Sequence, residues 1–397
     1  MTALKDSFTS TGEKLFWHQE AMQNLRNGKG QPIVSHIMPT DVCNAKCGFC
    51  SVGERPGDVM PFSWIKGYLD QLVPLGLKAV IISGGGNPIL YKDKESGADF
   101  NDLVDHIHRL GLEIGLITNG MPLVWYGGTY APDPNGDYND EKSGNRMRYI
   151  PGRYSWKTVR PDTLDKLTWC RISMAGLDSN HKEQEVFVPD FDRSKTSLGF
   201  SWIMADLYEE PSHKHGWVST PEDIRTEMDR SVVLATSRLP WIESKIREYV
   251  EKHDPSYVRL LCNCLQPDLI PERHAMLRAM GERIDPSRVF SQFKPPRQPR
   301  VCYKGYPHPV LNCDGWIYPC DSVVLNRTAG HQFNSDWRIC RWDEVGEFYA
   351  QPVRPNVPNT ICPGCVFSDQ VDLIASVVNG AETPMPSGAR PIHENFV

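Results

Sequence analysis

Short apolar runs alternate with amphipathic stretches along the middle of the chain, which is the rhythm of a parallel α/β sheet. Six runs are expected strands: Ile33–Met38, Lys78–Ser83, Glu113–Thr118, Trp169–Met174, Leu198–Met204 and Tyr257–Cys262. They are short and rich in Val, Ile and Leu, as strands covered on both faces are. Four stretches between them are expected helices: Phe62–Val73, Asp99–Leu110, Pro161–Leu167 and Trp241–His253. The pattern predicts an α/β fold, a partial (β/α)6 TIM-like barrel.

Two segments interrupt this rhythm. Residues 121–160 are rich in Gly, Pro, Asn, Asp and aromatic residues. A loop of this length in a compact domain is usually a lid or a binding loop, and a surface excursion packed by its own aromatic rings is the alternative. Residues 293–299 have the proline-rich sequence FKPPRQP, which indicates an extended linker. We therefore expect an N-terminal extension (1–30), a barrel core (31–292), a small cysteine-rich domain (300–370) and a C-terminal tail (371–397).

Charge and hydropathy exclude some classes of protein. The formal net charge of −6 argues against a domain whose main task is to grip nucleic acid. No stretch reaches the roughly eighteen apolar residues that cross a bilayer. The first residues also lack the apolar segment of a secretory signal. We therefore expect no nucleic-acid partner, no membrane span and a cytoplasmic location.

The twelve cysteines need an explanation of their own. In a large chain without an export signal, clustered cysteines more often bind metal or do redox work than form disulfides. Cys43, Cys47 and Cys50 come directly after the first expected strand, so their loop lies at the end of the strand where barrel active sites are built. Three thiolates so close together suit an iron–sulfur cluster with one open iron, or a zinc site with a fourth ligand elsewhere.

This CxxxCxxC loop resembles the signature of the radical S-adenosylmethionine (SAM) superfamily. In that family three cysteines hold a [4Fe–4S] cluster, and SAM chelates the open iron through its methionyl amine and carboxylate. Reduction then cleaves SAM to a 5′-deoxyadenosyl radical, which abstracts hydrogen from substrate. The resemblance implies that Cys43, Cys47 and Cys50 are iron ligands and that Phe49 packs against adenine.

The segment after the second expected strand also resembles the family. Gly84, Gly85 and Gly86 are similar to its GGE motif, whose backbone meets the SAM amino group. Glycine permits such close approach of main chain to ligand. Gly86 stands where an acidic residue is usual, and this is a departure from the motif.

Two further segments match in order. Asn119 lies in a Thr-Asn-Gly segment similar to the family's TNG, at the end of the third expected strand. Ser173 lies in a segment that resembles (R/V)xSxDG, with Ala175 where Asp is common. The resemblance implies that Ser173 lies near SAM, and an ordinary hydroxyl at a strand end is the alternative. It covers roughly residues 30–265.

A second group of cysteines lies near the C-terminus. Cys302, Gly315 and Cys320, followed by Cys362 and Cys365, form the pattern C-x12-G-x4-C … C-x2-C. The pattern resembles the SPASM/twitch extension of radical SAM enzymes, which carries auxiliary iron–sulfur clusters. No cysteine follows Cys365, so the match is better to the shorter twitch form. The resemblance implies one auxiliary cluster held by Cys302, Cys320, Cys362 and Cys365.

Two cysteines of this group are spare in that scheme. Cys313 and Cys340 could replace a ligand, support a second, incomplete cluster or serve as buried structural thiols, which we favour. The rival for the whole group is a zinc ribbon, because CxxC pairs often bind zinc.

Cys262 and Cys264 follow each other at the end of the sixth expected strand. Residues two apart share a face of an extended strand, so both thiols could face the same cavity. A thiol there could return a hydrogen atom to a substrate radical, as some radical SAM epimerases require. Ordinary packing, or ligation of a cluster, are the alternatives.

We therefore expect an oxidoreductase or epimerase that uses SAM and two iron–sulfur clusters on a small polar, natural-product or sugar-like substrate. Its other partner would be an electron donor such as flavodoxin or ferredoxin. A peptide or protein maturase that forms a crosslink or an oxidised residue is the second candidate. The third is a zinc-containing binding protein without radical chemistry, which the departures at Gly86 and Ala175 would favour.

Overall fold

The computed structural model describes most of the chain. The residues outside the description are 1–3, 46, 48, 49, 51, 53, 54, 121–123, 126–128, 133, 135–137, 140–145, 151, 152, 155–158, 175–187, 191, 205–237, 263–269, 295, 296, 298–300, 326–333 and 357–364. Phe49, Ala175, Cys264 and Cys362 are among them. Among the described residues, no helix is both long enough and apolar enough to cross a membrane.

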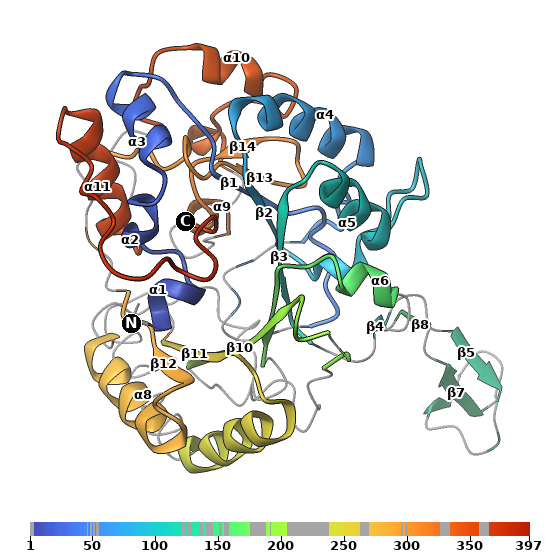
Figure 1. The fold of residues 1–397 in the computed structure, drawn as a ribbon. Helices are drawn as coiled ribbons and strands as arrows, with labels where there is room; N and C mark the ends of the chain where they lie inside the picture. Colours follow the sequence, from blue (N-terminus) through green and yellow to red (C-terminus); the bar gives the residue numbers. More distant parts are fainter. Residues whose placement is uncertain are drawn as a thin grey trace, which may run out of the picture.

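A nine-stranded sheet forms the centre of the molecule, in the order β12-β11-β10-β9-β3-β2-β1-β13-β14 (Figure 1). The six expected strands are all present: β1 (Val34–Ile37), β2 (Ala79–Ile82), β3 (Glu113–Thr118), β9 (Trp169–Ser173), β10 (Ser197–Met204) and β11 (Tyr257–Cys262). Each runs parallel to its neighbours. The prediction of a partial TIM-like barrel is therefore confirmed, and β12 (Val289–Ser291) adds one more parallel strand beside β11.

Helices come between the parallel strands along the chain and cover the sheet (Figure 1). They are α4 (Phe62–Leu72), α5 (Phe100–Arg109), α6 (Pro161–Leu164), a helix over residues 238–253 and α8 (Ile270–Ile284). Helix α4 gives way to the 3-10 turn η1 (Val73–Leu75), as expected where Pro74 removes a backbone donor. A second 3-10 turn, η2 (Pro88–Leu90), follows β2.

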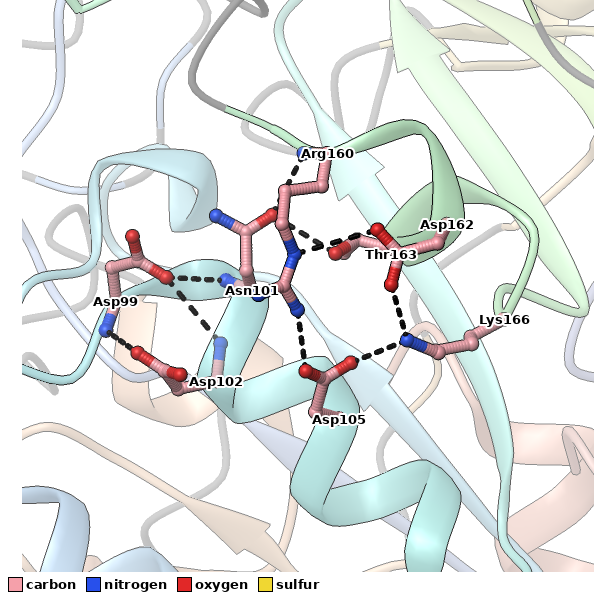
Figure 2. Close-up of polar contacts among 8 residues, drawn as sticks. All are labelled: Asp99, Asn101, Asp102, Asp105, Arg160, Asp162, Thr163 and Lys166. Atoms are coloured by element: carbon pink, nitrogen blue, oxygen red, sulfur yellow. Dashed lines mark hydrogen bonds and ion pairs between the residues drawn. The ribbon is translucent and has the colours of Figure 1, made fainter.

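Helix α5 begins with a capping box and is tied to α6, as Figure 2 shows. Asp99 accepts from the backbone of Asn101 and Asp102, while Asp102 accepts from the backbone N–H of Asp99. The side chain of Asn101 then accepts from the backbone N–H of Arg160 (2.9 Å) and from the Thr163 hydroxyl (2.9 Å). These bonds anchor the chain where it returns from the insertion at 121–160.

The described parts of that insertion form two small antiparallel sheets. One pairs β4 (Val124–Trp125) with β8 (Arg153–Tyr154). The other has the order β5 (Thr129–Pro132), β7 (Arg146–Ile150), β6 (Tyr138–Asn139). Figure 1 shows β5 and β7 at the margin of the molecule, apart from the large sheet.

The cysteine-rich C-terminal region continues the large sheet. Strand β13 (Val310–Leu311) pairs in parallel with β1, and β14 (Ile317–Tyr318) pairs with β13 in the antiparallel direction. Four short elements complete the region: α9 (Asp321–Leu325), η7 (Ser335–Trp337), α10 (Val345–Ala350) and α11 (Ser368–Val378). The hydrogen bonds between β13 and β1 make this region part of the same core as the barrel.

Segments from both ends of the chain meet at the N-terminal ends of the barrel strands. The first helices are α1 (Leu4–Phe8), α2 (Gly12–Leu15) and α3 (Gln19–Arg26). Phe8 stacks on Tyr257 with ring centroids 4.5 Å apart, and Phe396 packs edge-on against Trp169 at 5.2 Å. The buried Lys14 donates to the carbonyl oxygens of His393 (2.7 Å) and Phe396 (3.2 Å). These contacts close the floor of the barrel.

Candidate active site

The loop of Cys43, Cys47 and Cys50 lies at the C-terminal ends of the parallel strands, directly after β1. All three cysteines are partly exposed, and the backbone N–H of Cys50 donates to the carbonyl oxygen of Cys47 (3.1 Å). The flanking segments pair through an antiparallel bridge between Thr40 and Val59. Both ends of the loop are therefore tied together, which keeps the three thiols on one short, closed segment.

The glycine turn after β2 packs directly against this loop. The backbone N–H groups of Gly86 and Asn87 donate to the carbonyl oxygens of Thr40 (3.2 Å) and Val42 (2.8 Å). A Cβ atom on Gly86 would lie only 2.0 Å from the Val42 oxygen, and one on Gly84 would lie 2.9 Å from the Thr40 oxygen. The departure from GGE at Gly86 thus has a physical reason, because no side chain fits there unless the cysteine loop moves.

A network of amide side chains joins the ends of β1, β2 and β3. Asn119 donates to Asn44 Oδ1 (2.8 Å), and Asn87 donates to Asn119 Oδ1 (3.1 Å). The Thr118 hydroxyl donates to Asn87 Oδ1 (2.8 Å), which orients that buried amide. Asn119 Nδ2 also lies 3.8 Å from Cys43 Sγ. The structure therefore brings the predicted Asn119 to the cysteine loop, and it adds Asn87 and Asn44, which the motifs had not singled out.

Arg55 links two segments of this site, although the sequence analysis missed it. Its guanidinium donates to Gly85 O (3.0 Å), Ala45 O (3.2 Å) and Cys50 Sγ (2.9 Å). It therefore bridges the glycine turn and the cysteine loop. An arginine in a loop has no spacing that distinguishes it, so no sequence signal could have identified this role.

The charge of Arg55 fits a site for thiolate ligands. Burial raises the pKa of the Cys43 thiol, and the Arg55 guanidinium works against that rise. A cation that donates to a cysteine sulfur favours the thiolate, which is the form that binds metal. Three cysteines with such a cation fit an iron–sulfur cluster, whose ligands are thiolates.

Ser173, the last residue of β9, is half-buried and lies opposite Ser201 of β10. It shares the inner face of the sheet with Arg171, because alternate residues of a strand point the same way. The C-terminal end of this inner face is the edge of the sheet at which the cysteine loop lies.

Three of the four predicted auxiliary ligands come together around a buried lysine. Burial raises the pKa of the Cys320 thiol well above its usual value, and the nearby Cys302 and Cys365 thiols raise it further. Lys304 lies among these thiols and is 2% exposed. The fourth ligand, Cys362, lies outside the described residues.

The buried ammonium of Lys304 favours a negatively charged group beside it. Burial lowers the pKa of its ammonium, which Asp321 and the three thiols partly restore. Its Nζ lies 3.0 Å from His308 Nδ1 and 4.7 Å from the Phe367 ring centroid, and no described carboxylate forms an ion pair with it. Because a buried cation needs a nearby negative charge, thiolates on a metal centre fit this surrounding better than neutral thiols do.

The remaining described cysteines are more deeply buried. Burial raises the pKa of the Cys340 thiol to about 12, and it raises that of Cys313 as well. The sulfur of Cys313 and the carboxylates of Asp41 and Asp58 lie within 4.8 Å of one another.

Cys262, of the middle pair of cysteines, is 5% exposed and packs with Leu260 in the core, on the strand face opposite Arg259. Its predicted partner Cys264 lies outside the described residues.

Comparison with known proteins assigns this site to a family. Residues 37–124, which carry the cysteine loop, the glycine turn and Asn119, match the radical SAM superfamily model. This segment therefore carries the sequence of the radical SAM superfamily. Members use a [4Fe–4S] cluster and SAM, which agrees with the thiols and the cation found here. No curated protein matches the chain.

Solved structures of radical SAM enzymes resemble the chain at low identity. Streptococcus suis SuiB bound to S-adenosylmethionine is 15% identical over 78% of this chain and 64% of its own, with a TM-score of 0.42. The enzyme anSMEcpe with bound AdoMet is 13% identical over 86% and 83%, with a TM-score of 0.44. BtrN in complex with AdoMet and 2-DOIA is 12% identical over 88% and 92%, with a TM-score of 0.34. This chain thus spans less than two thirds of SuiB, and scores this low carry no argument about its substrate.

Proposed function

We propose that this protein reductively cleaves SAM and abstracts a hydrogen atom from a small polar, natural-product or sugar-like substrate, in an epimerisation or an oxidation. The observation that carries the proposal is the contact of the cysteine loop with the glycine turn, bridged by Arg55. This contact places the cysteine thiols, which would hold the cluster, beside a stretch of main chain that could contact SAM. The cluster would supply the electron that cleaves SAM to a 5′-deoxyadenosyl radical.

The chain's own residues would bind and orient the two groups. Cys43, Cys47 and Cys50 would ligate the [4Fe–4S] cluster, with the Arg55 guanidinium donating to the Cys50 sulfur. Backbone groups of Gly84, Gly85 and Gly86 would meet the SAM amino group, because glycine lets a ligand approach the main chain. Phe49 would pack on the adenine ring.

Two polar side chains would complete the SAM pocket. Asn119 reaches the Cys43 sulfur and is held in place by Asn44 and Asn87, so it would fix the wall of the pocket nearest the cluster. Ser173 would bind SAM from the end of β9.

The C-terminal region would carry one auxiliary iron–sulfur cluster on Cys302, Cys320, Cys362 and Cys365. The buried ammonium of Lys304 supports this assignment, because an anionic centre would balance it. An electron donor such as flavodoxin or ferredoxin would reduce the protein.

A hydrogen atom could be returned to the substrate from the middle pair of cysteines. Burial of Cys262 on the face opposite Arg259 favours a packing role for that thiol. Cys264, the other member of the pair, stays our candidate donor. Turnover in D2O would place solvent deuterium in the product if the reaction is an epimerisation.

Anaerobic purification tests the proposal. We expect a brown protein with roughly eight irons per chain, for two four-iron clusters, that releases 5′-deoxyadenosine from SAM after reduction. Cys50→Ala should lose about half the iron and all SAM cleavage, whereas Cys320→Ala should lose the other half and keep the SAM-binding cluster. A colourless protein with stoichiometric zinc and no 5′-deoxyadenosine would contradict the proposal.

A further inference from the structure

A cavity of about 80 Å³ lies on the inner face of the barrel, above its closed floor. Its lining comes from several strands, with His36 on β1, Ile117 on β3, Arg171 on β9 and Arg259 on β11. This volume is the space of about two to three water molecules. It suits one carboxylate or phosphate group better than a whole substrate.

The described lining carries a surplus of positive charge. Arg171, Arg259 and Lys294 line the cavity, against a single carboxylate among the described lining residues, that of Asp321. The histidines of the lining do not change this balance near pH 7, because burial lowers the pKa of His36 to about 4 and that of His393 to about 3. The positive charge of the described lining therefore makes this cavity suitable for an anion.

Neutral groups orient the two guanidinium groups. Arg259 donates to Gln292 Oε1 (3.3 Å) and to Ser201 Oγ (3.3 Å). Arg171 lies 5.6 Å from the Trp169 ring centroid, and its Nε is buried without a hydrogen bond to any described residue. No described carboxylate forms an ion pair with Arg171. A planar guanidinium with an unused donor is suited to an oxyanion.

Two glycines create the space for this arrangement. A Cβ atom on Gly115 would lie 2.2 Å from the Trp169 ring, and one on Gly199 would lie 2.1 Å from the Tyr257 ring. The two rings can therefore lie flat across neighbouring strands. Arg171 and Arg259 come two residues after Trp169 and Tyr257, and so share the inner face with them.

The cavity also lies in line with the cysteine loop. Ser173 is two residues further along β9 than Arg171, about 7 Å towards the C-terminal edge of the sheet. A ligand held by Arg171 would therefore extend up the inner face towards the SAM site. The charged end of a substrate would be fixed at the bottom, and its reactive carbon would lie nearer the cluster.

We propose that the substrate carries a carboxylate or phosphate group and that Arg171 and Arg259 bind this oxyanion inside the barrel. This inference rests on the proposed function, because it names the substrate class of that site. It also narrows the substrate class to molecules that carry an oxyanion, which matches the positive charge of the described lining.

Anion binding to the iron-loaded full-length protein tests the proposal. The probes are inorganic phosphate and acetate, each compared with chloride at equal ionic strength, and the readout is the thermal midpoint. A ligand that binds only the folded state raises the midpoint. We expect at least one probe to raise it in the wild type, with phosphate alone indicating a phosphate ester and acetate alone a carboxylate.

Variants locate the binding site. Arg171→Gln and Arg259→Gln should each weaken probe binding at least tenfold, and Arg171→Lys, which keeps the charge but not the planar fork, should weaken it less. The matched control is Arg278→Gln, which changes an exposed arginine on α8. The proposal is supported if the probe no longer raises the thermal midpoint of Arg171→Gln and Arg259→Gln but still raises that of Arg278→Gln. Equal responses in all variants, or no response in the wild type, would overturn it.

Two further arms separate this proposal from its neighbours. The response should persist with saturating SAM, and if SAM abolishes it, the probe occupies the SAM carboxylate site and the proposal is wrong. Substrate-free SAM cleavage should be unchanged in the control Arg278→Gln. If the wild type binds the probe but never cleaves SAM, the proposed function fails while the anion site stands.

Discussion

At the scale of single residues, short backbone contacts decide which side chains the site can hold. Gly86 has no room for a side chain because the Val42 carbonyl occupies the position of its Cβ. Arg55 owes its importance to the same closeness, since the loop and the turn are near enough for one guanidinium to reach both. Here the acid of the family motif is replaced by direct packing of main chain on main chain.

Gly86→Ala should disturb the cluster site more than an ordinary glycine substitution does. Its Cβ would lie 2.0 Å from Val42 O, so the cysteine loop must move, and we expect SAM cleavage to fall at least tenfold with loss of iron. Gly86→Glu, which recreates the acidic residue of the GGE motif, should not restore activity, because its Cβ atom meets the Val42 oxygen in the same way. Gly12→Ala is the control, since its nearest neighbour is 3.7 Å away. Full activity in Gly86→Ala would refute the packing argument.

At the scale of elements, polar groups hold α5 and α6 together (Figure 2). Asp105 of α5 bonds Arg160 and Lys166. Partial burial would raise the pKa of Asp105, but hydrogen bonds from Lys166 and Arg160 outweigh it and hold the pKa below its usual range. Next to these exposed charges, Asn101 is buried and accepts two hydrogen bonds. The buried amide should matter more to stability than the exposed ion pairs.

Asn101→Ala should lower the free energy of unfolding by about 1–3 kcal/mol, because it leaves the backbone N–H of Arg160 and the buried Thr163 hydroxyl without their acceptor. The thermal midpoint would measure the loss. Asp162→Ala, which removes an exposed partner of Lys166, is the control and should change the midpoint little. If the two variants melt alike, the amide is not the main link between the helices.

At the scale of the whole molecule, segments distant in the sequence complete one core. Strand β13 extends the barrel sheet from β1, so the cysteine-rich region and the cysteine loop are joined through two hydrogen-bonded strands. The floor of the barrel is closed jointly by α2 and the residues around Phe396. Lys14 joins these two segments at a buried position.

The stability of this floor should depend on pH through Lys14. Burial lowers the pKa of Lys14 from 10.5 to about 7. Between these values the unfolded chain holds a proton that the folded chain has released, so stability rises as pH rises through this window, by at most about 1.4 kcal/mol per pH unit. Below pH 7 both states are protonated, and the contribution is constant.

Comparison of the wild type with Lys14→Met isolates this effect. From pH 7 to pH 9, the thermal midpoint of the wild type should rise relative to that of the variant. Lys94→Met, at an exposed position, should follow the wild type at every pH. A constant difference between the wild type and Lys14→Met over this range would show that Lys14 keeps an ordinary pKa when folded.

Local patterns predicted those parts of the fold that depend on neighbours in the sequence. The six strands have the expected positions because short Val-, Ile- and Leu-rich runs are buried on both faces of a parallel sheet. Strand β12 escaped notice because three residues are too short for a pattern. The spacing of Cys43, Cys47 and Cys50 identified the site because one loop must supply all three ligands.

The sequence by itself determined the order of strands and helices, the cysteine loop at the end of β1 and the family to which that loop points. These features follow from periodicity and spacing, which act over a few residues. Only the tertiary structure decided that Arg55 reaches Cys50, that Lys304 lies among three cysteines and that Arg171 and Arg259 line one chamber. Those contacts join residues on different strands and loops, and their closeness depends on how the sheet curves and packs.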